Sequence, residues 1–245
     1  MSGIILILIL LALIAVRVPI AIALGLSSII ILLSFTAQQI NSLATQFSHT
    51  MEIVPLLSLP FFVLAANFMT TGGVAQRLIA LANALVGRFR GGLAMASLLA
   101  CALFSAVSGS APATVIAVGS VMIAGMVKSG YKKEFAAGVI CNAGTLGILI
   151  PPSLVMVIYG AVSETSIGNL FLAGIVPGIL LTIIMMIVIA VIAHIQDLPR
   201  FKVVPLKETI GLCFDAFPGL FTLVIILGGI YSGLFSPTEA AAVAA

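Results

Sequence analysis

The chain has 245 residues, of which 62% are hydrophobic and only 7% are charged. A water-soluble domain needs about a quarter of its residues charged to hydrate its surface, so this composition excludes most soluble folds. The net charge of +3 comes from basic residues in short loops between apolar stretches, which reports on membrane topology and excludes a nucleic-acid partner. The sequence therefore predicts an all-α polytopic transmembrane protein in the lipid bilayer.

The first apolar stretch covers residues 4–33 and contains Pro19. At about 1.5 Å per residue, a continuous helix of that length would exceed the ~30 Å hydrocarbon core, so it must kink, tilt or project beyond the hydrocarbon, and the natural place for a kink is the proline. A second span is expected over residues 55–69. The amphipathic stretch 74–87 is expected to lie in the membrane interface, and a short span stays open for it.

Residues 91–127 form an apolar stretch with basic residues on both sides. Arg90 precedes it and Lys128 follows it, so the positive-inside rule places both of its ends on the cytoplasmic side. Its middle reads Ser108-Gly-Ser-Ala-Pro112, where glycine, hydroxyls and proline interrupt a helix. The stretch is therefore expected to enter the membrane and return. The glycine and the proline favour a re-entrant hairpin, and a full antiparallel crossing stays open.

Residues 134–162 form the next apolar stretch, which glycine and proline interrupt again. Gly144-Thr-Leu-Gly147 and Pro151-Pro-Ser153 lie within it. Consecutive prolines remove two amide donors and disfavour helical geometry at the residue before them. One membrane crossing is therefore expected to split into two half-helices.

Residues 164–245 complete the chain. The long apolar run over residues 167–195 predicts one span, and an amphipathic cytoplasmic segment and a further span are expected after it. Ser236-Pro-Thr-Glu239 predicts a capping box, with proline in the first turn of another helix.

The two interrupted stretches share one physical problem. Non-helical backbone at membrane depth is costly, because its amide and carbonyl groups find no water, and it survives only where protein or an aqueous cavity satisfies those groups. Broken backbone frees carbonyl oxygens for a cation, and the N-termini of half-helices direct partial positive charge at an anion. Two such breaks close in the sequence therefore predict an ion or substrate site.

Enzymatic functions are disfavoured. The two histidines, His49 and His194, have no carboxylate or thiol at metal-ligand spacing, which argues against a zinc site. The sequence around Ser108 loosely resembles the nucleophile loop of an intramembrane serine protease, but that chemistry needs a base within hydrogen-bond reach, and His194 is expected at the cytoplasmic end of its helix. A channel is disfavoured because no ring of charge or repeated filter is present.

Several short motifs in a fixed order carry a family resemblance. The run from Gly144 to Ser153, GTLGILIPPS, resembles the large membrane subunit of tripartite ATP-independent periplasmic (TRAP) transporters, the DctM-like family. Further segments that match this family, in the same order as in its members, are Pro60–Ala65, Leu85–Gly92, Ser108–Ser110 with Ala113-Thr114, Gly130-Tyr131, Ile158–Gly160, Ser166–Gly174, Pro177-Gly178 and Ser236–Val243.

The resemblance implies an elevator-type secondary transporter built from an inverted repeat. Residues 1–90 would be scaffold helices and an interfacial arm helix. Residues 91–163 would be the transport region, with a re-entrant hairpin over 91–127 and a broken helix over 134–162, and residues 164–245 would complete the first repeat. Sodium would be the coupling ion, with no other cofactor. The substrates would be organic acids of the C4-dicarboxylate or sialic-acid type.

The resemblance also implies partners and a location. A periplasmic substrate-binding protein would deliver the organic acid, and a small four-helix membrane subunit would pack alongside as scaffold. The protein would be a multi-pass protein of the bacterial inner membrane.

Carried over by position, the resemblance makes Ser108–Ser110 the hairpin tip and Gly144–Ser153 the unwound segment, which together would enclose a sodium site and one wall of the substrate site. Residues implied in ion or substrate binding are Ser108, Gly109, Ser110, Thr114, Asn142, Gly144, Thr145, Gly147, Pro151, Pro152 and Ser153. Those implied as sodium ligands are Ser108, Ser110, Gly144 and Thr145, whose hydroxyl and carbonyl oxygens suit a hard cation.

Members of the family are far longer than this chain, which stops at Ala245 inside an expected helix. The chain is therefore expected to hold the first repeat, able to bind an ion but unable to transport alone. One other function stays open: a non-transporting membrane assembly module whose breaks serve helix packing.

Overall fold

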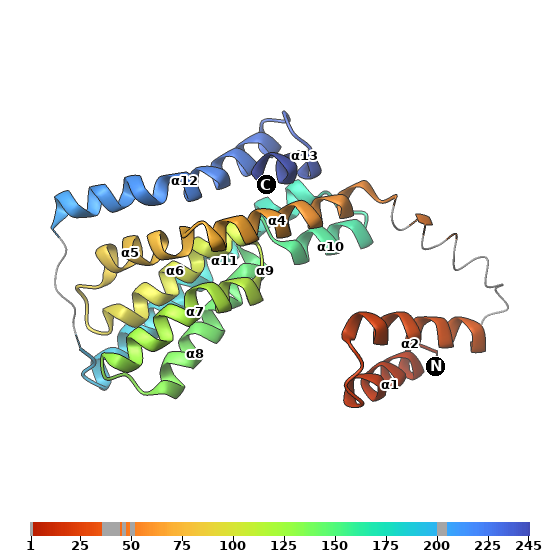
Figure 1. Ribbon diagram of the computed structural model, residues 1–245, viewed down its shortest axis with the longest axis horizontal. Helices are drawn as coiled ribbons and strands as arrows, with labels where there is room; N and C mark the ends of the chain where they lie inside the picture. The colour runs from red at the N-terminus through yellow and green to blue at the C-terminus, as the bar shows by residue number, and fades with distance from the viewer. Residues whose placement is uncertain (1, 36–44, 46–47, 50–51, 200–204) are drawn as a thin grey trace. The chain divides into compact units, whose positions relative to one another are not determined.

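A computed structural model describes residues 2–35, 45, 48–49, 52–199 and 205–245 of the chain. Every regular element in these ranges is a helix (Figure 1). The chain divides into two compact units, Met1–Ile53 and Val54–Ala245, each with its own internal packing.

The first unit contains a pair of helices, α1 (Ser2–Ala15) and α2 (Ile20–Phe35), that pack on each other. The expected kink at Pro19 is a complete break, because α1 ends before Arg17, which has a left-handed conformation with φ of 66°. Proline cannot continue the hydrogen-bond ladder and restricts the residue before it, which explains why α2 starts only at Ile20.

The second unit starts with the 3-10 turn η1 (Val54–Leu57), followed by the helices α4 (Ser58–Thr71) and α5 (Val74–Val86). The sequence predicted α5 as an amphipathic helix in the membrane interface. Its apolar face is buried against protein, by α6 (Gly92–Ser108) and α12 (Leu206–Tyr231). The amphipathic pattern therefore agrees with packing inside the unit, and the location in the membrane interface stays a prediction.

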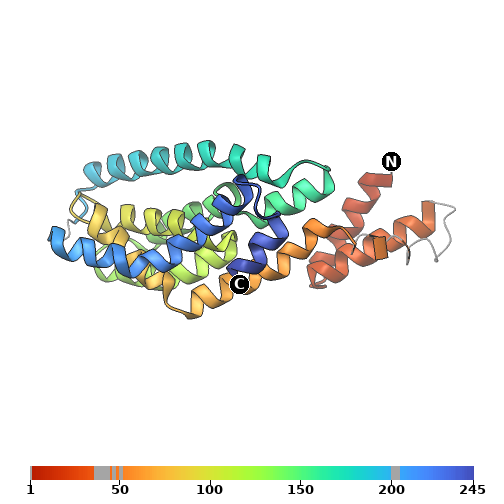
Figure 2. The same cartoon turned by 90° about the horizontal axis from the view of Figure 1, so that it is seen from above.

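An antiparallel helical hairpin forms the centre of this unit (Figure 2). Its arms are α6 and α7 (Ala111–Lys128), which are joined only by Gly109 and Ser110. Alanine and serine on several faces of α6 let neighbouring helices approach closely, and almost the whole helix is buried. The outer ends of both arms therefore lie at the same end of the unit.

The next helix is broken. α8 (Lys133–Gly144) is followed by the single turn α9 (Leu146–Leu149), and helical geometry resumes in α10 (Leu154–Val162). The parts before and after the break are bent by 42° relative to each other. The pair Pro151-Pro152 explains the break, since neither residue can donate an amide hydrogen to the preceding turn.

Two long helices and a short one complete the unit. α11 (Ile167–Ile195) contains Pro177 and α12 contains Pro218, and neither helix is interrupted. The sequence predicted an amphipathic segment and then a separate span where α12 is one continuous helix. Proline inside a membrane helix is tolerated where neighbouring groups satisfy the freed carbonyl, so Pro218 alone does not divide α12. The last helix is α13 (Pro237–Ala244).

The predicted fold class is confirmed: the described chain is all-α, and it is a polytopic membrane protein. Four of its helical segments are long and apolar enough to cross a bilayer, and the broken helix makes a fifth if its two parts are one span. The four are Val54–Thr71, Ala111–Lys128, Ile167–Ile195 and Lys207–Tyr231.

The start of the hairpin is tied to the end of α11. The guanidinium Nη1 of Arg90 lies 3.2 Å from Oδ1 of Asp197, and the amide of Gly91 donates to the carbonyl of Pro199 at 3.3 Å. Gly91 has φ of 67°, and a side chain there would collide with Ala193. Because α7 ends beside the start of α6, Lys128 belongs to this same basic end of the unit.

Helix α13 begins with the predicted capping box. The Oγ of Ser236 accepts from the Glu239 amide at 3.3 Å, and the Glu239 carboxylate accepts from the Ser236 amide at 2.7 Å and from its hydroxyl at 2.8 Å. These bonds favour the ionised carboxylate and lower the pKa of Glu239 below its ordinary 4.5. The bond from the Ser236 backbone amide has the larger effect, and the bond from the Ser236 hydroxyl has the smaller one.

This capping box predicts a pH dependence at the start of α13. A lowered pKa means that the stabilisation is present above pH 4.5 and is lost as the pH falls through the lowered pKa, so the first turn of α13 is expected to fray only in acid. Ser236→Ala is expected to raise the pKa of Glu239 toward 4.5. A carbon-detected NMR titration of the labelled Glu239 carboxyl measures its pKa in the unmodified chain and in the variant. An unchanged pKa in the variant would contradict a contribution of the Ser236 hydroxyl to the lowered pKa.

Candidate functional site

The hairpin tip is a two-residue turn built by glycine, serine and proline. Gly109 ends α6 in a left-handed conformation, with φ of 61°, and its amide donates to the Ser105 carbonyl at 2.9 Å. Glycine takes this conformation without the steric cost of a side chain. Ser110 caps α7, where its Oγ accepts from the Ala113 amide at 3.5 Å, and Pro112 occupies the first turn, in which a missing amide is harmless.

The break in the second helix is an extended segment between α9 and α10. The amide of Ile150 donates to the Leu146 carbonyl at 2.8 Å, and Ile150 itself is extended, with ψ of 121°. Pro151, Pro152 and Ser153 follow, all of them buried. The segment therefore leaves helical geometry inside the protein and not at its surface.

The two breaks are in direct contact. The amide of Leu154, the first residue of α10, donates to the carbonyl of Gly109 at 3.1 Å. A side chain on Gly109 would collide with the Pro152 carbonyl oxygen. The hairpin tip and the unwound segment thus satisfy each other's backbone and are joined backbone to backbone.

Two further glycines let α8 and α9 lie against the hairpin. A Cβ on Gly147 would lie 2.8 Å from the Ala111 amide nitrogen, and a Cβ on Gly144 would collide with Val115. Both glycines are buried and lie on the same side of the helix, three residues apart. Their missing side chains bring the first turn of α7 against the broken helix.

Three buried hydroxyls meet behind the hairpin tip. The Thr114 Oγ1 lies 3.2 Å from Ser105 Oγ and 3.2 Å from Ser108 Oγ, and it donates to the Ser110 carbonyl at 2.9 Å. Because Thr114 has one hydrogen, which it gives to that carbonyl, both serines must donate to it. Their own lone pairs then point elsewhere, and Ser108 also accepts weakly from the Ser110 amide at 3.5 Å. We call Ser105, Ser108 and Thr114 the hydroxyl cluster.

Ser153 adds an oxygen on the other side of the contact. Its side chain is only 1% exposed, and its Oγ has no hydrogen-bond partner among the described residues. Buried hydroxyls in proteins nearly always bind something, so an unpartnered one marks a place for a water or an ion. Ser153 lies at the start of α10, next to the residue that bonds Gly109.

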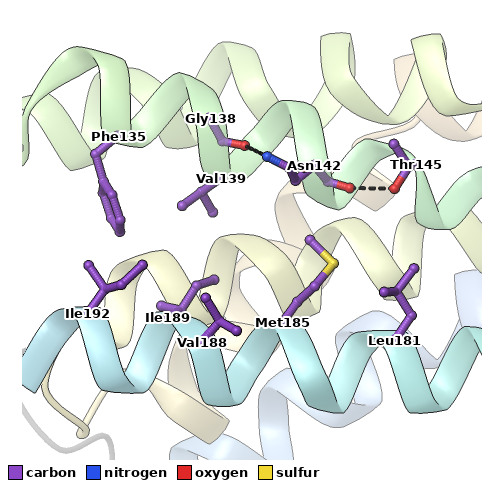
Figure 3. Close-up of a pocket in the computed structure, with 10 residues that line it drawn as sticks. All are labelled: Phe135, Gly138, Val139, Asn142, Thr145, Leu181, Met185, Val188, Ile189 and Ile192. Carbon is purple, nitrogen blue, oxygen red and sulfur yellow. Dashed lines mark hydrogen bonds between the residues drawn. The ribbon is translucent and has the colours of Figure 1, made fainter.

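Asn142 and Thr145 line a separate cavity and make no hydrogen bond to the hydroxyl cluster. This cavity of about 460 Å³ lies between α8 and α11, and Leu181 and Met185 line it too (Figure 3). The side-chain Nδ2 of Asn142 donates to the Gly138 backbone carbonyl at 2.8 Å, and the Thr145 hydroxyl donates to the Asn142 backbone carbonyl at 2.7 Å. The structure thus separates Asn142 and Thr145 from Ser108, Ser110 and Gly144, with which they were grouped on the sequence.

The structure adds residues that sequence reasoning missed. A cavity of about 90 Å³ beside the tip is bordered by Ser110 and Leu154 and, on α4, by Asn67 and Thr70. Both α4 side chains interrupt an apolar span at a spacing of three residues, which is a signal that could have been found. Ser105 was not among the predicted site residues, because it precedes the predicted break and lies within a continuous helix.

The chemistry of the site is that of neutral oxygen ligands. Among the described residues, no group of three or more His, Cys, Asp or Glu side chains could hold a metal ion. Hydroxyl and carbonyl oxygens suit hard cations such as the alkali and alkaline-earth ions. Helix α7 is capped by Ser110 of the hairpin tip and α10 begins at Leu154, which bonds Gly109, so both N-termini, each with partial positive charge, lie next to the contact.

Comparison with known proteins adds the family context. The family model for the "Tripartite ATP-independent periplasmic transporter, DctM component" matches residues 7–245. The C4-dicarboxylate TRAP transporter large permease protein DctM of Pseudomonas aeruginosa is 59% identical over 220 residues, which cover 90% of this chain and 52% of that protein. The protein of the same name from Vibrio cholerae is 57% identical over 221 residues, covering 90% and 49%.

Some more distant relatives carry another name. The ectoine TRAP transporter large permease protein TeaC of Halomonas elongata is 43% identical over 204 residues, which cover 83% of this chain and 48% of that protein. The chain thus spans about half the length of the curated relatives it matches. All of these relatives are named as transporter permeases and none as an enzyme, which agrees with the prediction from the sequence.

Proposed function

The chain belongs to the family of the DctM component of tripartite ATP-independent periplasmic transporters, and we propose that it forms the ion-binding half of a sodium-coupled organic-acid permease. The observation that carries this proposal is the hydrogen bond between the Leu154 amide and the Gly109 carbonyl, which joins two breaks of the helical backbone. Broken helices that meet at membrane depth are the usual place for a coupling ion in secondary transporters.

Sodium is the proposed coupling ion because of the ligands at this contact. The hydroxyl oxygens of Ser108, Ser110 and Ser153 are neutral and hard, and the Pro152 carbonyl oxygen of the unwound segment lies against Gly109 at the hairpin tip. Gly144 serves as a point of close approach between helix and hairpin. The Thr145 hydroxyl lies on another face of its helix and is not a ligand in this proposal.

A C4-dicarboxylate is the proposed substrate class. The most similar of the relatives described above, at 57% and 59% identity, carry that substrate in their names. The converging N-termini of α7 and α10 supply hydrogen-bond donors and positive potential for a carboxylate. A sodium ion at the same contact adds a full positive charge, so ion and anion binding support each other.

The proposed assembly follows from the family. A periplasmic substrate-binding protein hands over the acid, a small membrane subunit packs alongside, and the complex lies in the bacterial inner membrane.

Within this chain, the bond between tip and unwound segment makes hairpin and broken helix move as one body. Sodium binding then favours the conformation in which the hairpin tip and the unwound segment together form one wall of the substrate site.

The hydroxyl cluster offers a test of sodium binding. Thr114→Val keeps the shape of the side chain but removes the oxygen that organises Ser105 and Ser108, so the sodium concentration for half-maximal stabilisation is expected to rise about tenfold. The measurement is thermal unfolding of the purified chain, followed by circular dichroism, as sodium replaces potassium at constant ionic strength.

Ser97→Ala is the matched control. Ser97 is also fully buried in α6, but it bonds the Leu93 carbonyl and the Met126 sulfur far from the tip. This variant is expected to lower stability without changing the sodium dependence. If sodium and potassium stabilise the unmodified chain equally, the breaks serve packing only and the assembly-module function is favoured.

A further inference from the structure

A groove runs along α7 toward the start of α8, away from the hairpin tip. It has a volume of about 820 Å³ and an apolar wall formed by one side of α7. Residues on that wall include Ile116, Ser120, Ile123 and Val127. At its base the helices approach closely, since a Cβ on Gly119 would lie only 2.8 Å from an Ile140 methyl carbon.

The wall of this groove is exposed within the described chain. Helix α7 is one of the candidate spans, and only 33% of that span is buried inside the protein. The Ile116 side chain is 69% exposed and the Val127 side chain 42%. No described part of the chain therefore covers this wall.

One end of the groove is basic. Lys128 and Lys133 both line it, and neither has a carboxylate within ion-pair distance among the described residues. Arg90, whose partner is Asp197, belongs to the same end of the unit. The excess of basic residues places this end at the cytoplasmic face of the membrane, where anionic lipids are concentrated.

We propose that this groove binds an anionic phospholipid of the cytoplasmic leaflet. One acyl chain lies along the apolar wall of α7, and the phosphate lies between the ammonium groups of Lys128 and Lys133. Charge complementarity selects this occupant, because basic pockets at the cytoplasmic ends of membrane helices bind anionic headgroups. A zwitterionic lipid would fill the apolar wall but would leave both lysines without a counter-charge.

The test measures lipid selectivity in a bilayer. The full chain is reconstituted in phosphatidylcholine vesicles with trace spin-labelled phosphatidylglycerol or phosphatidylcholine, and electron paramagnetic resonance gives the association constant of each label. The unmodified chain is expected to prefer phosphatidylglycerol, and Lys128→Gln and Lys133→Gln are each expected to reduce that preference about fivefold.

Two further variants separate a groove from diffuse surface charge. Lys132→Gln removes a neighbouring exposed lysine that does not line the groove, so the preference is expected to stay. Ala124→Phe fills the apolar wall while keeping both lysines, so the preference is expected to fall. The proposal is overturned if the unmodified chain shows no preference, if Lys132→Gln acts like Lys133→Gln, or if Ala124→Phe has no effect.

Discussion

Replacing Gly109 with alanine is expected to abolish sodium-dependent stabilisation of the chain. The new methyl group would collide with the Pro152 carbonyl oxygen, and alanine in a left-handed conformation costs about 1–2 kcal/mol by itself. The chain can relieve the collision only by moving the hairpin tip from the unwound segment, which breaks the bond between the Leu154 amide and the Gly109 carbonyl. The same sodium titration by circular dichroism measures the loss.

Gly233→Ala is the control for this prediction. Gly233 also has a positive φ, of 74°, but a Cβ there would meet no atom within 4 Å. The Gly233→Ala variant therefore has the conformational strain of a left-handed alanine without a collision. A lowered unfolding temperature with an intact sodium effect is expected for Gly233→Ala. If both variants respond to sodium in the same way, contact between the breaks does not matter for ion binding.

Gly147→Ala is expected to weaken sodium binding through packing alone. Its Cβ would lie 2.8 Å from the Ala111 amide nitrogen and 3.0 Å from the Ser110 carbonyl carbon, so it pushes the start of α7 off the broken helix. Overpacking of this kind typically costs ~1–3 kcal/mol, which outweighs the gain of about 1 kcal/mol from replacing glycine in a helix. A sodium concentration for half-maximal stabilisation at least about tenfold higher is expected.

Gly138→Ala, on the same broken helix, is expected to change the stability in the opposite direction to Gly147→Ala. A Cβ there has no atom within 4 Å, so the substitution brings only the helix preference of alanine. A slightly higher unfolding temperature and an unchanged sodium dependence are expected. Equal weakening in the two variants would mean that the close approach at Gly147 is not what holds the site together.

The sequence located both breaks because glycine and proline act locally. A left-handed glycine ends a helix and a proline pair interrupts one in nearly any surroundings, so the ends of α6 and α9 could be predicted within a residue or two. That the two breaks enclose one site was a hypothesis from the sequence, and the hydrogen bond between the Leu154 amide and the Gly109 carbonyl was not predicted, since no local rule states which distant backbone will satisfy a freed carbonyl.

Which side chains face the contact could not be predicted. Thr145 lies beside Gly144 in the sequence, yet each residue along a helix turns by about 100°, and the close packing of Gly144 and Gly147 on the hairpin fixes that rotation. Thr145 is thereby directed toward α11. Asn67 and Thr70 carry a local signal, as polar side chains three residues apart in an apolar span, but that they border the tip depends on how α4 packs there, which is a tertiary contact.

Direct binding of radioactive sodium to the purified chain tests whether the two touching breaks hold a sodium ion. We expect saturable binding of one ion per chain that excess unlabelled sodium displaces and excess potassium does not, and that Gly109→Ala removes. Absence of saturable binding in the unmodified chain, or equal displacement by potassium, would contradict it.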